Sequence, residues 1–271
     1  MSAEPARTGP MKLRLTLALA AVTLAAAAPH RPQRIVSRNL CADQLLLELA
    51  DRVQIAALTR NAADPFWSAA AAKARGIKRL GGSAEELVGL QPDLVIGYEG
   101  AAPPPGGARF LGLGSAESYA EIVAQIRGVA SAVGHPARGE AMIARMDRAL
   151  AALPRARSGA TAAYYQRRGY LTGTGTLIDD LMDRVGLVNL AARLDRPPLS
   201  PVSIEEMVAF RPDYLIVESS TVRVRDQGTE MLHHPALAAI PRLRLPQAWT
   251  VCGGPAYVAA ARSLAEQMAR R

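Results

Sequence analysis

The chain has 271 residues, of which 49% are hydrophobic and only 4% aromatic, and it carries a formal net charge of +8. This length accommodates two domains of ordinary size, and the mixture of apolar helices and short apolar strands favours a globular α/β protein. The arginines are spread along the sequence, with no basic run interleaved with aromatic residues, so we expect no binding to nucleic acid.

The first 28 residues have the composition of a targeting segment. Lys12 and Arg14 form a short basic region, residues 15–24 form an apolar core, and four alanines at residues 25–28 offer small side chains for cleavage. The apolar core is too short for a transmembrane helix, and no cysteine follows it to accept a lipid. We therefore expect a signal peptide over residues 1–28 and a soluble protein of the periplasm without a lipid anchor.

Short apolar strands alternate with helices through the first half of the mature chain. We expect strands at residues 34–37, 53–58, 94–96 and 109–113, and helices at residues 44–50, 65–75, 84–91 and 118–133. A longer helix is expected at residues 137–153, directly after Pro136. This alternation predicts a parallel sheet.

The second half continues in the same way. We expect strands at residues 160–165 and 249–251, and helices at residues 177–185, 235–240 and 256–269. A glycine-rich turn at residues 173–176 stands before the first of these helices.

One segment of the sequence occurs twice. Residues 83–97 return as residues 203–217, at a constant offset of 120 residues. Solenoid repeats have periods of about 20–50 residues, whereas this offset is the size of a domain. Each copy begins with a serine N-cap and a glutamate three residues later, and then turns at Pro-Asp into an apolar strand. We therefore expect two Rossmann-like parallel-sheet lobes, residues 33–133 and 156–271, joined by a single long α-helix within residues 134–155.

Glu85 and Glu205 are the acids of the two copies that have no capping role. A carboxylate in the first helical turn is favoured by the helix dipole, by about 0.3–1 kcal/mol, which accounts for both residues without any function. The alternative is that this matched pair, one acid per lobe, docks onto a basic partner.

The leader, the repeat and the interlobe helix are accompanied by five shorter motifs, at residues 34–37, 39–44, 90–96, 186–191 and 249–255. Together they resemble the periplasmic substrate-binding proteins that serve ABC importers of cobalamin, iron-siderophores and haem, over about residues 34–268. Within that group the chain looks most similar to the cobalamin binders. Residues 78–81 lack the tryptophan that those binders place before the first docking glutamate. The resemblance therefore leaves a related corrinoid, a siderophore or another metal chelate as the ligand.

The resemblance implies that this ligand lies in the cleft between the lobes. It also implies that one surface glutamate per lobe enters an arginine pocket on a membrane permease dimer. The glutamates that match are Glu85 and Glu205.

Ligands of parallel sheets lie beyond the carboxyl ends of the strands. This rule, with the resemblance, predicts a set of ligand-binding cleft residues: Arg38, Asn39, Cys41, Arg60, Trp67, Tyr98, Tyr165, Tyr170, Trp249 and Cys252. The aromatic members offer flat apolar surface to a chelate, or simply pack in the core. Arg60 either meets a carboxylate of the ligand or is plain surface charge.

Cys41 and Cys252 are the only cysteines, and each is expected in a turn that faces the cleft, on opposite lobes. Free thiols are the favoured expectation. The alternatives are direct contact with the ligand or its metal, and a disulfide. A disulfide needs Cα atoms within about 7 Å and would hold the cleft closed.

Two other classes of function are disfavoured. A bare metal ion requires several converging ligands, but apart from His30 next to the leader the histidines are His135, His233 and His234, and His135 is distant in sequence from the other two. An enzyme of the hydrolase kind is also disfavoured, because residues 112–116 lack the second glycine of a nucleophile elbow and residues 173–176 lack the spacing of a phosphate-binding loop. We therefore expect a monomeric binding protein without catalytic residues, a metal site or a cofactor; the alternatives are an exported α/β enzyme and a protein for bare metal ions.

Overall fold

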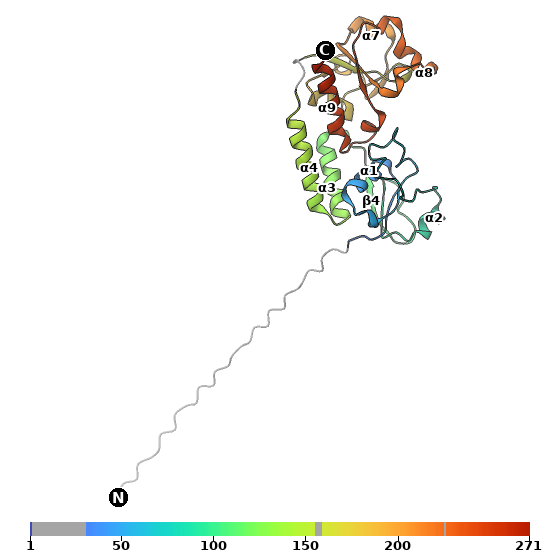
Figure 1. Cartoon of the computed structure of the whole chain (residues 1–271), viewed down its shortest axis with the longest axis vertical. Coiled ribbons are helices and arrows are strands. Elements are labelled where there is room, and N and C mark those ends of the chain that lie inside the picture. The colour runs from blue at the N-terminus through green and yellow to red at the C-terminus, as the bar shows by residue number, and fades with distance from the viewer. Residues whose placement is uncertain (2–30, 155–158, 225) are drawn as a thin grey trace. The chain divides into compact units, whose positions relative to one another are not determined.

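Figure 1 shows the computed structural model of the chain, which describes Met1 and residues 31–154, 159–224 and 226–271. Residues 31–271 form one compact unit. Apart from Met1, the expected signal peptide lies outside the described residues.

The first sheet contains four parallel strands in the order β2-β1-β3-β4. Val36 of β1 lies beside Val95 of β3, which lies beside Phe110 of β4. The strands are β1 (Ile35–Ser37), β2 (Ile55–Ala57), β3 (Leu94–Tyr98) and β4 (Arg109–Leu113). The helices among them are α1 (Leu40–Leu49), the 3₁₀ helix η1 (Arg52–Gln54) and α2 (Ala84–Gly89).

The second sheet also contains four parallel strands, in the order β10-β9-β5-β7. They are β5 (Thr161–Tyr164), β7 (Val188–Asn189), β9 (Tyr214–Glu218) and β10 (Arg242–Leu245). A separate antiparallel pair consists of β6 (Tyr170–Thr172) and β8 (Leu199–Pro201). The helices are α5 (Leu177–Arg184), α6 (Leu190–Arg193), α7 (Ile204–Phe210) and α8 (Gln227–Glu230). Short 3₁₀ helices are η2 (Arg167–Gly169), η3 (Ser219–Val222), η4 (Met231–His233), η5 (Pro235–Leu237) and η6 (Gln247–Trp249).

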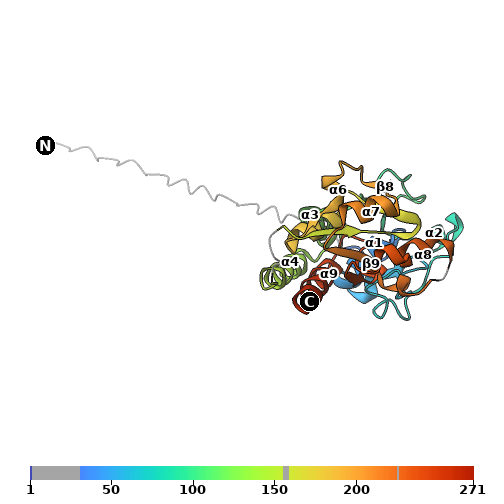
Figure 2. The ribbon, with the colours of Figure 1, turned by 90° about the horizontal axis from the view of Figure 1, so that it is seen from above.

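Two separate parallel sheets confirm the expected fold class. Between them in the chain come α3 (Tyr119–Ala132) and α4 (Pro136–Ala151), which pack against each other. The C-terminal helix α9 (Ala256–Ala269) packs against α4, beside which Figure 1 and Figure 2 show it, and also against β10 of the second sheet. Pro136 occupies the first turn of α4, where its missing N–H costs no hydrogen bond.

The largest apolar core contains residues of both sheets. Ile96 of β3 and Ile216 of β9 belong to it and are fully buried, together with Ile126 of α3 and Leu264 of α9. Val95, the neighbour of Ile96, points to the other face of the first sheet and joins a smaller core there. Moving the two sheets far apart would expose part of the shared core to water, at about 25 cal/mol per Å² of apolar surface. The packing therefore opposes a wide hinge motion.

The helix expected at residues 65–75 is not formed. This segment is a series of turns with hydrogen bonds three residues apart, such as Ala74 N–H to the carbonyl of Ala71. Neighbouring elements capture its backbone groups: the guanidinium of Arg52 donates to the carbonyls of Lys73 and Arg75, and Gln44 of α1 accepts from the N–H of Ala69. These partners replace helical hydrogen bonds, so high alanine content does not decide the conformation.

Two further expectations need correction. Residues 249–251 are not a strand, because η6 ends at Trp249 and the edge strand of the second sheet is β10. Helix α1 begins at Leu40, earlier than expected, because the side chain of Asn39 caps it by accepting hydrogen bonds from the N–H groups of Cys41 and Ala42.

Candidate functional site

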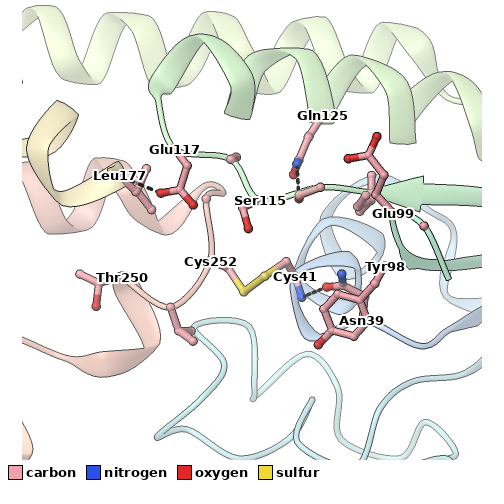
Figure 3. A pocket seen from close by; sticks show the side chains of 16 residues that line it. Asn39, Cys41, Tyr98, Glu99, Ser115, Glu117, Gln125, Leu177, Thr250 and Cys252 are labelled. Carbon is pink, nitrogen blue, oxygen red and sulfur yellow. Dashed lines mark hydrogen bonds between the residues drawn. A yellow bond between two sulfur atoms is a disulfide. The ribbon is translucent and has the colours of Figure 1, made fainter. Parts of the chain in front are cut away.

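A cavity of about 460 Å³ lies at the carboxyl ends of the first sheet, where both halves of the chain contribute side chains. Asn39 follows β1 and Tyr98 ends β3. The second half contributes Leu177, the first residue of α5, and residues 250–253. Figure 3 shows these residues around the cavity. Its position is that of a ligand site in a parallel α/β fold.

Tyr98 is the most exposed aromatic side chain of this cavity, with 61% of its surface accessible. Its hydroxyl forms no hydrogen bond within the described part of the chain. Burial of Val95 and Ile96 fixes the direction of the strand, so that its last residue emerges at the cavity. Tyr98 therefore offers both a flat apolar face and an unused hydroxyl group to a ligand.

Glu117 connects the two halves of the chain at the cavity. Its carboxylate accepts a hydrogen bond of 3.0 Å from the N–H of Leu177 at the start of α5. The cavity is also lined by Gln125, whose side-chain amide donates to the carbonyl of Gly114. Glu99 packs over Gly114 so closely that a Cβ there would lie 2.6 Å from its carboxylate. The glycine thus makes room for the Glu99 side chain.

A second hollow, of about 240 Å³, adjoins this cavity and shares Glu117, Leu177 and Thr250 with it. It is lined by residues of the second lobe, among them Glu218, the last residue of β9. Burial raises the pKa of Glu218, against the smaller lowering effects of a hydrogen bond from Ser220 and the charge of Arg167. The two hollows form one cleft between the sheets.

Cys41 and Cys252 form a disulfide across this cleft, with Cα atoms 5.3 Å apart. The favoured expectation of free thiols, and the alternative of a thiol bound to ligand or metal, are therefore wrong. Gly253, the neighbour of Cys252, lets this loop lie against the segment before α3, because a Cβ there would lie 2.5 Å from that of Ala116. The sequence shows a glycine at position 253, but it does not show which residues pack against it in the folded chain.

The sequence matches the periplasmic binding protein family over residues 35–244, which is well over half of the chain. The chain belongs to this family. No curated protein is similar enough to the sequence to count as a match. No helix among the described residues is long and apolar enough to cross a membrane.

Several solved structures share the fold of this periplasmic binding protein. The apo form of the periplasmic heme-binding protein RhuT from Roseiflexus sp. RS-1 is 25% identical, with a TM-score of 0.69, covering 87% of this chain and 97% of that chain. The periplasmic vitamin B12 binding protein BtuF of Vibrio cholerae is 16% identical (TM-score 0.62; 88% and 97% covered). A protein of an ABC-type Fe3+-hydroxamate transport system from Saccharomonospora viridis DSM 43017 is 19% identical (TM-score 0.63; 88% and 93% covered). The last two likenesses concern the fold alone.

Four of the expected cleft residues line the cavity of this periplasmic binding protein. They are Asn39, Cys41, Tyr98 and Cys252. Asn39 is 3% exposed and its side-chain oxygen is engaged in capping α1, so its main contribution is structural.

Tyr165 is not a cleft residue, which corrects that expectation. It is 1% exposed, packs in the second lobe's own core, and donates a hydrogen bond of 3.0 Å from its hydroxyl to the carbonyl of Val202. Strand β5 ends one residue earlier, at Tyr164, and successive residues point to opposite faces.

The remaining expected residues do not line either hollow. Tyr170 lies on β6 opposite Pro201, and Trp249 is half-buried against the main core. Trp67 packs edge-on against Phe66 in the turn region that replaces the expected helix. Arg38 and Arg60 are exposed after β1 and β2.

Sequence reasoning missed Gln125, Glu117 and Glu218 as cleft residues. Glu218 is predictable from the repeat, because it stands 120 residues after Tyr98 and ends the equivalent strand. Extending the repeat by one residue would have predicted it. No pattern in the sequence predicts Glu117 and Gln125 as cleft residues. Glu117 lies in the loop before α3 and Gln125 lies on α3, and only the packing of the folded chain brings them to the cleft.

Glu85 and Glu205 are both exposed in the first turns of α2 and α7, and neither forms an ion pair within the described residues. Hydrogen bonds from its own backbone and from Ser83 lower the pKa of Glu85. Their neighbours are engaged instead: Glu86 pairs with Lys78 at 3.3 Å, and Glu206 pairs with Arg196.

Proposed function

We propose that this protein is the substrate-binding component of an ABC importer, and that it captures a corrinoid or a ferric-siderophore-type chelate in the cleft between its sheets. The observation that carries the proposal is Tyr98, an exposed aromatic ring with an unused hydroxyl at a cavity of about 460 Å³. Flat chelates present apolar faces, which an aromatic side chain covers well. Solved structures with this fold include binders of heme, vitamin B12 and Fe3+-hydroxamate.

An enzyme is supported less well than a binding protein. Ser115 lines the cavity, but no histidine lines either hollow among the described residues, so the cleft holds no serine-histidine pair of the kind that activates a serine nucleophile. Periplasmic binding proteins are parts of transport systems, and the chain belongs to that family.

A bare metal ion is also supported less well. Among the described residues, no group of three or more histidine, cysteine, aspartate or glutamate side chains is placed to hold a metal ion. His135 contacts Asp51 and Gln54, none of which lines either hollow, and His233 contacts the carbonyl of Thr221. The metal would therefore enter as the centre of a chelate, and the protein would contact the chelating molecule.

The test is a calorimetric titration of the protein with cobalamin, cobinamide, haem and a set of ferric siderophores. We expect one chelate class to bind and Tyr98→Ala to weaken it by roughly thirtyfold, the order of 2 kcal/mol usual for a buried aromatic anchor. Tyr170→Ala is the matched control, because this tyrosine is exposed but lies outside the cavity. Tight binding of a free divalent ion, with no chelate bound, would refute the proposal.

Delivery to the membrane would use Glu85 and Glu205. They occupy equivalent first turns, one per lobe, and neither forms an ion pair within the described chain. A two-fold symmetric permease dimer could receive one acid in each arginine pocket, since a carboxylate and a guanidinium pair well in two parallel hydrogen bonds.

A further inference from the structure

The cleft is acidic although the protein is basic. Three carboxylates line its two hollows, those of Glu99, Glu117 and Glu218, and among the residues that the structure describes no lysine, arginine or histidine lines either one. The whole chain has a formal charge of +8. The sign of the local charge is therefore opposite to that of the molecule.

Nearby cations do not neutralise these acids by direct pairing. The charge of Arg167 acts to lower the pKa of Glu218, but the Arg167 guanidinium forms an ion pair with Asp226. Arg38 and Arg60 are exposed on the first lobe and line neither hollow. Within the described residues, no salt bridge reaches any of the three cleft carboxylates.

The three carboxylates differ in how well hydrogen bonds from the protein or contact with solvent stabilise their charge. Glu117 accepts a hydrogen bond from Leu177 and lies at the positive end of α5. Glu99 is exposed to solvent. Glu218 is half-buried, and among the described residues the one side chain that donates a hydrogen bond to it is Ser220, at a long 3.3 Å. A carboxylate removed from water without a cation or several donors is unfavourable, so Glu218 is the group that gains most from a ligand.

Glu218 also lies at a strand end that lines the cleft. It ends β9 as Tyr98 ends β3, and the two are separated by the repeat offset of 120 residues. The same strand end thus carries an aromatic ring in one lobe and a carboxylate in the other, and both line the cleft.

We propose that the cleft selects chelates without net negative charge, and that Glu218 recognises a positively charged or amide-bearing edge of the ligand. This inference rests on the proposed function and narrows it. Amide groups of a corrinoid and the ammonium group of a cationic hydroxamate siderophore both donate hydrogen bonds to a carboxylate. Chelates rich in carboxylates or catecholates would instead meet three like charges.

The test compares ligands that differ only in charge. One series is the ferric complex of a linear trihydroxamate with a terminal ammonium group, its neutral N-acetyl derivative and its anionic N-succinyl derivative. The other is cobinamide and a derivative in which one side-chain amide is hydrolysed to a carboxylate. Within whichever series binds, we expect affinity to fall by roughly ten- to hundredfold from the cationic or amide form to the anionic form, the usual range for a hydrogen bond to a charged group.

Glu218→Gln tests the residue itself, with Glu230→Gln as a control. Both replace one carboxylate of the second lobe by an amide, but Glu230 is exposed on α8 and outside the cleft. We expect Glu218→Gln to remove most of the charge discrimination by weakening the cationic form and strengthening the anionic one, while Glu230→Gln leaves both affinities unchanged. Thermal unfolding of each variant checks that the fold is retained.

The outcomes separate the two proposals. If the anionic member of a series binds as tightly as the cationic one, or if Glu218→Gln keeps the discrimination, the charge inference is overturned and the binding function stands. If no member of either series binds, and haem and other ferric chelates do not bind either, the proposed function is overturned together with the inference.

Discussion

Asp43 is a fully buried acid that connects three segments of the first lobe. It lies in the first turn of α1, and its carboxylate accepts hydrogen bonds from the backbone N–H and the hydroxyl of Thr59, which follows β2. Burial raises the pKa of Asp43 to about 6, although hydrogen bonds from Ser37 and Thr59 act to lower it. This residue therefore makes the stability of the lobe depend on pH.

We predict that Asp43→Asn makes the free energy of unfolding depend less on pH. Because the folded pKa is above the unfolded one, Asp43 favours folding most below about pH 4, and this contribution is lost as the pH rises through 6. Two pKa units correspond to about 3 kcal/mol. Chemical unfolding at pH 4 and pH 7 measures this. Between pH 4 and pH 7, the free energy of unfolding of the variant should rise by roughly this amount relative to that of the wild type. Asp183→Asn, an exposed acid, is the control. A difference between wild type and variant that does not change with pH would contradict the prediction.

The cleft residues show how far single positions can be predicted. The same rule predicts Tyr98 and Tyr165 as cleft residues, since each stands at the end of an apolar strand. The structure exposes Tyr98 and buries Tyr165, because Tyr165 continues beyond β5 into a bridge with Leu171. A shift of one residue reverses the face of a strand. The sequence predicts the strand but not the residue at which it ends, and so it cannot decide such pairs.

The repeated helix starts are elements whose details were predictable. In α7 the capping box is complete: the N–H of Glu206 donates to the Ser203 hydroxyl, and the N–H of Ser203 donates to the Glu206 carboxylate. In α2 only the first of these bonds is made, because the Glu86 carboxylate accepts from the N–H of Gly81. The local signal thus predicts the cap, while the loop before each helix decides the second bond.

We predict that Ser203→Ala lowers the free energy of unfolding by about 1 kcal/mol, the usual value of a lost N-cap. Glu206→Ala should cost more, because it also leaves Arg196 without its ion pair while the Nε atom of that arginine is buried and unpartnered. The adjacent exposed Glu205 is the control, and Glu205→Ala should change stability little. Denaturant-induced unfolding of the three variants measures whether their losses in free energy of unfolding follow this order. An equal loss at Glu205 would show that the cap is not the cause.

The helix expected at residues 65–75 shows where prediction at the scale of elements fails. Alanine-rich sequence favours a helix, but the preference is a few tenths of a kcal/mol per residue. Arg52 and Gln44, which lie more than 20 residues earlier, bind the backbone of this segment in turns. Those contacts exist only in the folded lobe, so the local pattern did not contain them.

At the scale of the whole molecule, the two exposed glutamates should act as a pair. We predict that Glu85→Gln and Glu205→Gln leave folding and ligand affinity unchanged, because neither acid contacts the cleft or forms an ion pair within the described residues. Each change should weaken binding to the permease, and the double variant should abolish import, since a broken charge pair at an interface typically costs about 2–5 kcal/mol. Transport into vesicles that contain the permease measures this. Full transport by the double variant would show that these acids are ordinary residues of a helix start.

The disulfide and the shared core together restrict how the two lobes move. Cys41 and Cys252 are 211 residues apart, so their bond closes most of residues 31–271 into one loop. Cross-linking a loop of this length is worth about 5 kcal/mol in the chain-entropy model, which makes the bond a large part of the stability of a single domain. Both cysteines line the cavity, and so the bond also fixes the two walls of the cavity relative to each other.

We predict that the double variant Cys41→Ser, Cys252→Ser still folds, because the core that joins the sheets is intact, but unfolds at a lower temperature and binds its ligand more weakly. The loss of affinity should come from the cleft, since one wall is then free to shift before binding and must be ordered again when the ligand enters. Treating the wild type with a reductant should reproduce both effects, which separates the loss of the bond from the effect of the serines. Small-angle scattering with and without ligand should show little difference for the wild type and a larger one for the double variant. Equal scattering changes in the two proteins would show that the shared core alone holds the lobes, and that the disulfide contributes stability without shaping the site.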